Sequence, residues 1–278
     1  MKRLMSRLLN PLLMAAVAIA AVAAVPVASQ AQTRPKVTTL GPDFPNTEMF
    51  VGNSFFYYNN GLPAHVTLLE KAADAENKAR YRATMVTIGG SGFDWHDLES
   101  YFRPNAVGAY SFDDNNVVVF NKPGKLYDAV VMMDCSQCPI HPQLKTVFTD
   151  YAKKNSEIAR AHGATPILFM SWAYEDKPEM TAQLAEAYTV AGNANNALVI
   201  PAGLAFARLR AKQPELNLYQ PDKRHPSLAG TYLASCVTFA ALTGRSPVGN
   251  SYLAGLDAPT AKLLQTVAWE TTQDYYGK

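Results

Sequence analysis

Cysteine and charge are both scarce in this chain of 278 residues. It has 3 cysteines and 17% charged residues, and its formal net charge is +2. Several of the basic residues, Lys2, Arg3 and Arg7, lie at the extreme N-terminus. The rest of the chain is therefore close to neutral, which argues against a nucleic-acid partner because that function requires a basic surface.

Sequence motifs for phosphate or metal binding are also missing. The run Gly89-Gly90-Ser91-Gly92 lacks the lysine and the spacing of a P-loop. No His, Cys, Asp or Glu cluster has the spacing of metal ligands. We therefore expect neither a nucleotide nor a metal, and predict no cofactor.

The one long apolar run lies near the N-terminus, from Leu12 to Val27. It follows the basic residues and precedes Ser29-Gln30-Ala31, which fits the small-x-small rule for signal peptidase. We predict a signal peptide at 1–31, export to the periplasm or the medium, and no stable membrane insertion after cleavage. The alternative is an uncleaved N-terminal anchor. About 245 residues remain, which favours a single domain over 32–278; its oligomeric state is open.

The cysteines form a C-x-x-C motif, Cys135 and Cys138, and a separate Cys236. An oxidising compartment favours a Cys135–Cys138 disulfide, although a bridge from either residue to Cys236 is an alternative. A thiol–disulfide redox site is a further interpretation of the motif. Pro139 argues against it, because a redox C-x-x-C usually continues into a helix.

Short apolar runs alternate with stretches of helical spacing along the chain. We expect strands at 48–51, 83–88, 127–133, 165–170 and 197–200. We expect helices at 62–80, 142–162, 178–191, 204–212 and 227–243, the last of these ending the fold. A short helix near 94–102 and a hairpin near 113–116 fill the irregular region between. Because unbroken apolar strands require burial on both faces, the pattern predicts a three-layer α/β/α sandwich with a parallel sheet of about five strands.

A serine follows the first predicted strand directly, in Gly52-Asn53-Ser54. In such sheets the reactive groups gather at the carboxyl ends of the strands. A serine hydroxyl becomes a nucleophile when a base within hydrogen-bond reach removes its proton. Taken alone, the tripeptide is also typical of an ordinary turn.

A candidate base and its carboxylate lie just before the last predicted helix, in Asp222-Lys-Arg-His225-Pro226. The three-residue spacing lets Asp222 reach the imidazole of His225 and stabilise its protonated form. The alternative is that these residues only lead into and cap the helix.

Together, Phe50-Val-Gly-Asn-Ser-Phe55 and Asp222-x-x-His225-Pro resemble the first and last blocks of the SGNH/GDSL hydrolases. The similarity is to a bacterial exported branch of that superfamily with little assigned function, and it runs from Phe50 to Gly249. It implies a flavodoxin-like fold and a triad of Ser54 as nucleophile, His225 as general base and Asp222 as orienting partner.

The resemblance also implies an oxyanion hole. Its donors would be the backbone amides of Ser54 and of Gly90, with Gly92 as the alternative glycine. The family's usual third donor is an asparagine after the third strand, but this chain reads Asp134-Cys-Ser-Gln-Cys-Pro there. The Gln137 amide or the Ser136 hydroxyl could replace it.

Two further residues, Trp95 and His96, are expected at the rim of the substrate cleft. The leading hypothesis is an exported serine esterase that acts on a small-molecule or carbohydrate ester, with O-acetyl sugars as the family analogy. A non-catalytic carbohydrate- or ligand-binding protein on the same scaffold is the alternative.

Overall fold

A five-stranded parallel sheet forms the centre of the protein. The computed structural model describes residues 33–41, 45–74, 76, 81–103, 105–107, 110–120 and 124–278. The sheet strands are β1 (Thr47–Gly52), β2 (Arg82–Thr87), β5 (Ala129–Met132), β6 (Thr165–Phe169) and β7 (Leu198–Ile200). Their order is β2-β1-β5-β6-β7, and every neighbouring pair is parallel. The chain turns from one half of the sheet to the other between β1 and β5, and ligands in such sheets bind at this switch point.

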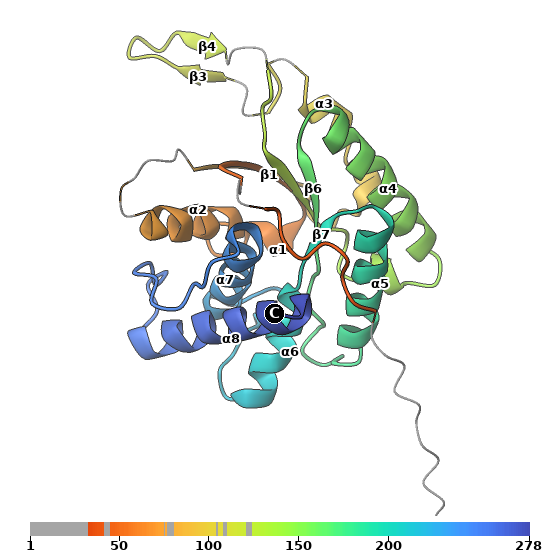
Figure 1. Cartoon of the computed structure of the whole chain (residues 1–278), viewed down its shortest axis with the longest axis vertical. Helices are drawn as coiled ribbons and strands as arrows, with labels where there is room; N and C mark the ends of the chain where they lie inside the picture. The colour runs from red at the N-terminus through yellow and green to blue at the C-terminus, as the bar shows by residue number, and fades with distance from the viewer. Residues whose placement is uncertain are drawn as a thin grey trace, which may run out of the picture. The chain divides into compact units, whose positions relative to one another are not determined.

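Helices cover the two faces of this sheet (Figure 1). One side carries α4 (Lys145–Ala161) and α5 (Met180–Ala194). The other carries α2 (Leu62–Ala73), α7 (Leu228–Thr243) and α8 (Ala258–Tyr276), with α6 (Ala202–Lys212) packed against α7 and α8. The predicted three-layer α/β/α architecture with a five-stranded parallel sheet is confirmed.

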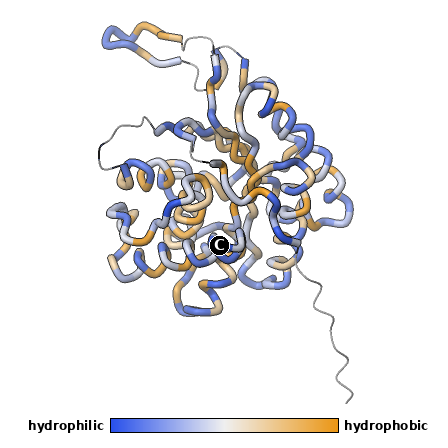
Figure 2. Tube along the Cα trace, in the orientation of Figure 1, coloured by the Kyte–Doolittle hydropathy of each residue, from blue (hydrophilic) through white to orange (hydrophobic). Residues whose placement is uncertain are grey.

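Burial of the strands explains why their sequences are unbroken apolar runs. All residues of β5 and β7 are buried, as are the last five of β1. Figure 2 shows hydrophobic positions gathered at the centre of the fold, where these strands lie. The edge strand β2 is only partly buried, and its sequence mixes polar and apolar residues accordingly.

Most helix boundaries differ from the predictions by one to three residues, but one helix is shorter than predicted and one was not predicted. The helix from Leu62 ends at Ala73; of its predicted remainder, 75 and 77–80 lie outside the described residues. The prediction that 227–243 ends the fold was wrong, because α8 follows it. Asp257 caps α8 by accepting a hydrogen bond from the Thr260 amide at 2.9 Å. The predicted signal peptide at 1–31 also lies outside the described residues.

The irregular region after β2 contains short elements. A 3-10 turn, η1 (Phe93–Trp95), precedes α3 (Leu98–Tyr101), and an antiparallel hairpin follows, β3 (Tyr110–Phe112) with β4 (Val118–Phe120). The remaining short elements are α1 (Ser54–Tyr57) after β1 and the 3-10 turn η2 (Cys138–Ile140) after β5. In the described parts of the chain, no helix has the length and apolar character of a membrane span.

Candidate active site

The segment after β1 places Ser54 at the first residue of α1. Asn53 is the N-cap of this short helix, and its side-chain oxygen accepts a hydrogen bond from the Phe55 amide at 3.2 Å. Its side-chain nitrogen donates to the Ser91 and Asp134 carbonyls, each at 3.1 Å. The asparagine thereby ties together the loops after β1, β2 and β5, and the position of Ser54 is fixed by three strand ends.

Three predicted residues from opposite ends of the chain meet at this point. The Nε2 atom of His225 lies 2.8 Å from the Ser54 Oγ atom, although 171 residues separate them. The Nδ1 atom of His225 hydrogen-bonds the Asp222 Oδ2 atom. An imidazole held this way keeps its proton on Nδ1 and has Nε2 free to accept the serine proton.

Asp222 is held as an anion by its surroundings. Burial alone would raise its pKa, but hydrogen bonds from the His225 ring and from the Arg224 and His225 amides lower the pKa to about 2. The two amides reach the Asp222 Oδ1 atom at 2.9 and 3.0 Å. The carboxylate is thus ionised at neutral pH, as an orienting partner of an imidazole must be.

Aromatic rings fix the plane of the His225 imidazole. Tyr58 stacks on it, with centroids 4.2 Å apart and an angle of 11°, and Phe55 meets it edge-on at 5.5 Å. Both rings come from α1 or the residue after it, so the segment that carries Ser54 also orients the base. Asn59, two residues after α1 ends, donates to the Pro226 carbonyl at 2.9 Å and locks the two segments together.

Two hydrogen bonds from the loop after β6 hold the loop that carries Asp222 and His225. The indole of Trp172 donates to the Arg224 carbonyl at 2.9 Å, and the Glu175 amide donates to the Lys223 carbonyl at 2.9 Å. Lys223 has a φ of 63°, a left-handed conformation that costs energy for a residue with a side chain. These long-range bonds hold the strained turn in place.

A cavity of about 300 Å³ opens beside the Ser54 hydroxyl. Its lining residues come from the ends of β1, β2 and β5 and from the two loops just described: Asn53, Ser54, Phe55, Gly90, Cys135, Ser136, Gln137, Tyr174, Arg224 and His225. Gly90 has a φ of 73°, and no atom lies within 4 Å of where its Cβ would be. Neither its amide nor that of Ser54 donates a hydrogen bond to another described residue. Both donors are therefore available to a ligand.

A disulfide shapes the wall formed by Ser136 and Gln137. Cys135 and Cys138 are bridged, and Cys236 is a buried free thiol. The hydroxyl of Ser136 hydrogen-bonds the Tyr174 hydroxyl at 2.7 Å. Gln137 makes no side-chain hydrogen bond to another described residue, so its amide is the less committed donor.

The carboxylate of Asp134 supports this loop from inside. It is buried and accepts hydrogen bonds from the Phe93 and Cys135 amides, each at 2.8 Å. Burial raises its pKa to about 6 against the effect of these bonds. Gly92 packs here and not on the cavity: an added Cβ would lie 2.9 Å from the Asp134 Oδ1 atom. Its predicted alternative role as an oxyanion donor finds no support in this position.

The two predicted rim residues lie elsewhere. His96 is 4% exposed, and its Nε2 atom lies 3.0 Å from the Ser91 Oγ atom and 3.1 Å from the Gly52 carbonyl oxygen. Burial lowers its pKa. The predicted position of His96 at the rim was wrong, because its ring is buried next to the end of β1 by these hydrogen bonds. Trp95 is 60% exposed but does not line the cavity.

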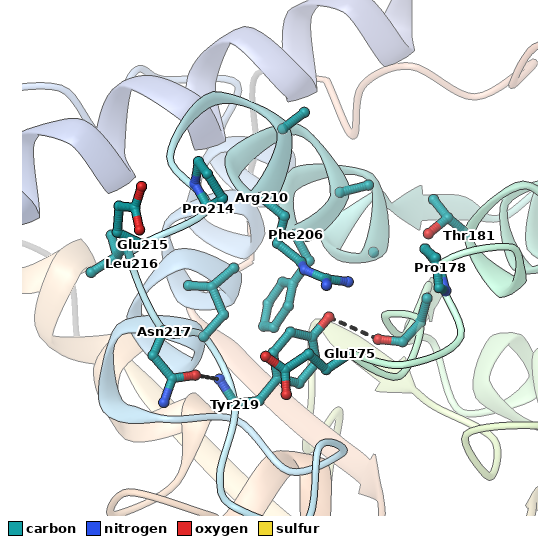
Figure 3. Close-up of a pocket in the computed structure, with 15 residues that line it drawn as sticks. Glu175, Pro178, Thr181, Phe206, Arg210, Pro214, Glu215, Leu216, Asn217 and Tyr219 are labelled. Atoms are coloured by element: carbon teal, nitrogen blue, oxygen red, sulfur yellow. Dashed lines mark hydrogen bonds between the residues drawn. The ribbon is translucent and has the colours of Figure 1, made fainter.

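A second cavity, of about 430 Å³, is lined in part by residues of the same loops (Figure 3). Phe206 and Arg210 of α6 form one wall, and Glu175 and Tyr219 belong to the loops that also border the first cavity. The Arg210 guanidinium lies 5.5 Å from the centre of the Tyr219 ring. Among the described residues, no three His, Cys, Asp or Glu side chains are grouped so as to hold a metal ion.

Sequence reasoning missed several residues of the site. The capping role of Asn53 was not predicted, although an Asn directly before a helix is a recognisable cap. Trp172, Tyr174 and Arg224 carried no usable signal, because their contacts depend on how distant loops meet. The stacking of Tyr58 on the His225 ring was not predicted either.

Solved structures with the same fold include a protein assigned to the SGNH hydrolases. A DUF4886 family protein from Bacteroides uniformis has a TM-score of 0.56 and 19% identity, over 81% of this chain and 93% of its own. A protein assigned to the SGNH hydrolases from Slackia heliotrinireducens has a TM-score of 0.52 and 23% identity, over 70% and 97%. TesA has a TM-score of 0.51 and 16% identity, over 71% of this chain and 98% of its own. No family model and no curated protein matches the sequence. The chain therefore has the fold of the SGNH hydrolases.

Proposed function

We propose that this protein, built on the SGNH-hydrolase fold, is a serine hydrolase that cleaves ester bonds. One observation carries the proposal: Ser54 Oγ lies 2.8 Å from His225 Nε2, while His225 Nδ1 is held by Asp222. Nucleophile, base and orienting group within hydrogen-bond reach are the recognised arrangement for acyl transfer. Asp222 and His225 do lead into α7, but the cap of that helix is Ser227.

The mechanism follows from these contacts. Ser54 Oγ attacks the ester carbonyl as its proton passes to His225 Nε2, and Asp222 stabilises the imidazolium. The oxyanion then accepts hydrogen bonds from the Ser54 and Gly90 amides and from the Gln137 side chain. His225 returns the proton to the leaving alcohol, which leaves an acyl-enzyme. Water, deprotonated by His225, hydrolyses it to the free acid and Ser54.

The proposed substrate is an ester of a small molecule or a carbohydrate, with an O-acyl sugar as the first candidate. A cavity of about 300 Å³ accommodates one small group beside Ser54. We also propose that the protein is exported after loss of residues 1–31, on the strength of the basic, apolar and small-residue pattern at its N-terminus.

A fluorophosphonate probe tests the nucleophile directly. Such probes phosphonylate only an activated serine, so one label per protein is expected, on the peptide that contains Ser54, as identified by mass spectrometry. Labelling should be lost in His225→Ala, which retains Ser54 but lacks its base. No label on the folded wild-type protein would rule the mechanism out.

A second candidate function is non-catalytic binding of a carbohydrate or similar ligand. It is favoured by the absence of an asparagine after β5, where the chain has Asp134-Cys-Ser-Gln. Loss of one oxyanion donor slows turnover by roughly 100- to 1000-fold in other enzymes. Absence of a label on Ser54 in the folded protein, together with binding of such a ligand, would favour this candidate, whereas labelling of Ser54 counts against it.

Opening the Cys135–Cys138 bridge should lower activity with little effect on the fold. The bridge encloses Ser136 and Gln137, so without it the Gln137 amide loses its fixed position and kcat should fall by about 10- to 100-fold. The closed loop is short, so the double variant Cys135→Ser/Cys138→Ser should lose only about 2 kcal/mol of stability. Cys236→Ser serves as the control. Equal kcat in all three proteins would exclude the role for the bridge.

A further inference from the structure

Arg224 is the one side chain with a permanent charge among the residues that line the cavity beside Ser54. Its backbone position is fixed, because its amide donates to Asp222 Oδ1 and its carbonyl accepts from the Trp172 indole, both at 2.9 Å. Its guanidinium carbon lies 4.8 Å from the centre of the Tyr174 ring. Since the Tyr174 hydroxyl bonds Ser136, the guanidinium is held at the cavity wall.

In the described part of the chain, no carboxylate forms an ion pair with this guanidinium. None of the ion pairs between described residues includes Arg224. Asp222, the nearest acid in sequence, is engaged by the His225 ring and two amides, and the Arg224 guanidinium is not among the groups that lower its pKa. Glu175, on the neighbouring loop, lines the second cavity instead (Figure 3).

A second cation lies over the same tyrosine ring. The Lys177 Nζ atom lies 5.9 Å from the centre of the same Tyr174 ring. Lys177 is likewise absent from the ion pairs of the described residues. The Tyr174 ring thus holds two cations near the cavity, and cations ordered in this way attract and orient anions.

We propose that Arg224 selects esters that carry an anionic group, such as a carboxylate, close to the scissile bond. This inference rests on the proposed hydrolase function and specifies its substrate class. A guanidinium offers a planar fork of N–H donors that matches a carboxylate, and Tyr174 preorganises it. The anion would be bound by Arg224 while the ester carbonyl lies at Ser54.

Paired substrates test this selectivity. The anionic esters are 3- and 4-acetoxybenzoate, and the neutral ones are their methyl esters, with kcat/KM measured for each. The quantity compared is the ratio of anionic to neutral kcat/KM, because the intrinsic reactivities of the esters cancel between enzyme variants. We expect Arg224→Gln to lower this ratio about tenfold and Arg224→Lys to lower it less. Added salt should lower the wild-type ratio as well.

Arg210→Gln is the matched control, since Arg210 also lies over a tyrosine ring but lines the second cavity (Figure 3). It should leave the ratio unchanged. An Arg224→Gln ratio equal to that of the wild type would overturn the proposal. If the wild type hydrolyses no ester, binding of 4-acetoxybenzoate to Ser54→Ala is measured by calorimetry, with and without Arg224→Gln. Binding that Arg224→Gln weakens tenfold would support the anion site although the hydrolase function fails. No binding would overturn both the anion site and the hydrolase function.

Discussion

Replacing Ser54 by alanine should lower kcat for p-nitrophenyl acetate and butyrate by roughly 10⁴- to 10⁶-fold. The substitution removes the hydroxyl that lies 2.8 Å from His225 Nε2, and no acyl-enzyme can form at this residue. His225→Ala should cause a loss of similar size because an unassisted serine is a poor nucleophile. The double variant should be no slower than either single one, since the two residues act as a unit.

The measurement is steady-state release of p-nitrophenol by each purified variant, beside its thermal unfolding midpoint. Ser251→Ala, at an exposed position before α8, is the control for serine loss. Tyr58 and Phe55 pack on the His225 ring, so His225→Gln should accompany His225→Ala to separate lost chemistry from lost packing. Undiminished activity in folded Ser54→Ala would mean that this site is not the catalytic one.

The meeting of Ser54 with His225 illustrates what a sequence can predict. Each residue follows or precedes an element with a strong pattern: Ser54 comes after the buried strand β1, and His225 comes before the apolar helix α7. Because parallel strands end at one edge of a sheet, topology places Ser54 at that edge. His225 follows no strand directly, and its pairing with Ser54 is what the resemblance to the SGNH/GDSL hydrolases implies. The roles of both residues stay proposals, but their proximity could be anticipated.

Contacts between loops could not be anticipated in this way. The Trp172 indole that supports Arg224 lies 52 residues away in sequence. The buried partners of His96 are Gly52, at the end of β1, and Ser91, in the loop after β2. A lone histidine or tryptophan has no period or spacing to interpret, so its position follows from packing. Arg224 was passed over for the same reason, as one of two basic residues between Asp222 and His225.

The omission of α8 has a different cause. Its N-terminal signals are present, with Asp257 as cap and Pro259 in the first turn. Its buried side includes Ala261, Leu264 and Ala268, at helical spacing. Buried threonines and a glutamine interrupt this stripe. Gln265 donates to the Tyr232 hydroxyl of α7 at 2.9 Å, whereas the Thr271 and Thr272 hydroxyls donate to carbonyls within α8. A buried face that is partly polar weakens the hydrophobic periodicity that prediction relies on.

Replacing Glu70 by glutamine should stabilise the protein at pH 8 and have little effect at pH 4. Glu70 of α2 and Glu48 of β1 are 1% and 0% exposed, and neither carboxyl group has a hydrogen-bond partner among the described residues. Burial, with their mutual repulsion and the charge of Asp128 acting on Glu48, raises the pKa of Glu48 to about 10, and burial raises that of Glu70 to about 8.

The direction of this pH effect on the free energy of unfolding follows from the number of protons that each state binds. Below pH 4.5, the ordinary pKa of a glutamate, the folded and unfolded chains both hold these protons, so the stability is fully present. As the pH rises from 4.5 toward 8, the unfolded chain releases its protons while the folded chain retains them. The unfolded state is then favoured, and stability falls across this interval. Glu70→Gln removes one of these titrations and should recover on the order of 3 kcal/mol at pH 8.

Urea unfolding at pH 4, 6 and 8 measures this effect in the wild type, Glu70→Gln and Glu48→Gln. Glu157→Gln, at an exposed position of α4, is the matched control and should follow the wild-type pH dependence. Glu48 lies between Ala83 of β2 and Ala129 of β5, where the small neighbours leave room for a neutral amide. A stabilisation that is the same at all three pH values would point to packing and refute ionisation as the cause. A destabilisation at pH 8 would show that the carboxylates are compensated by a partner.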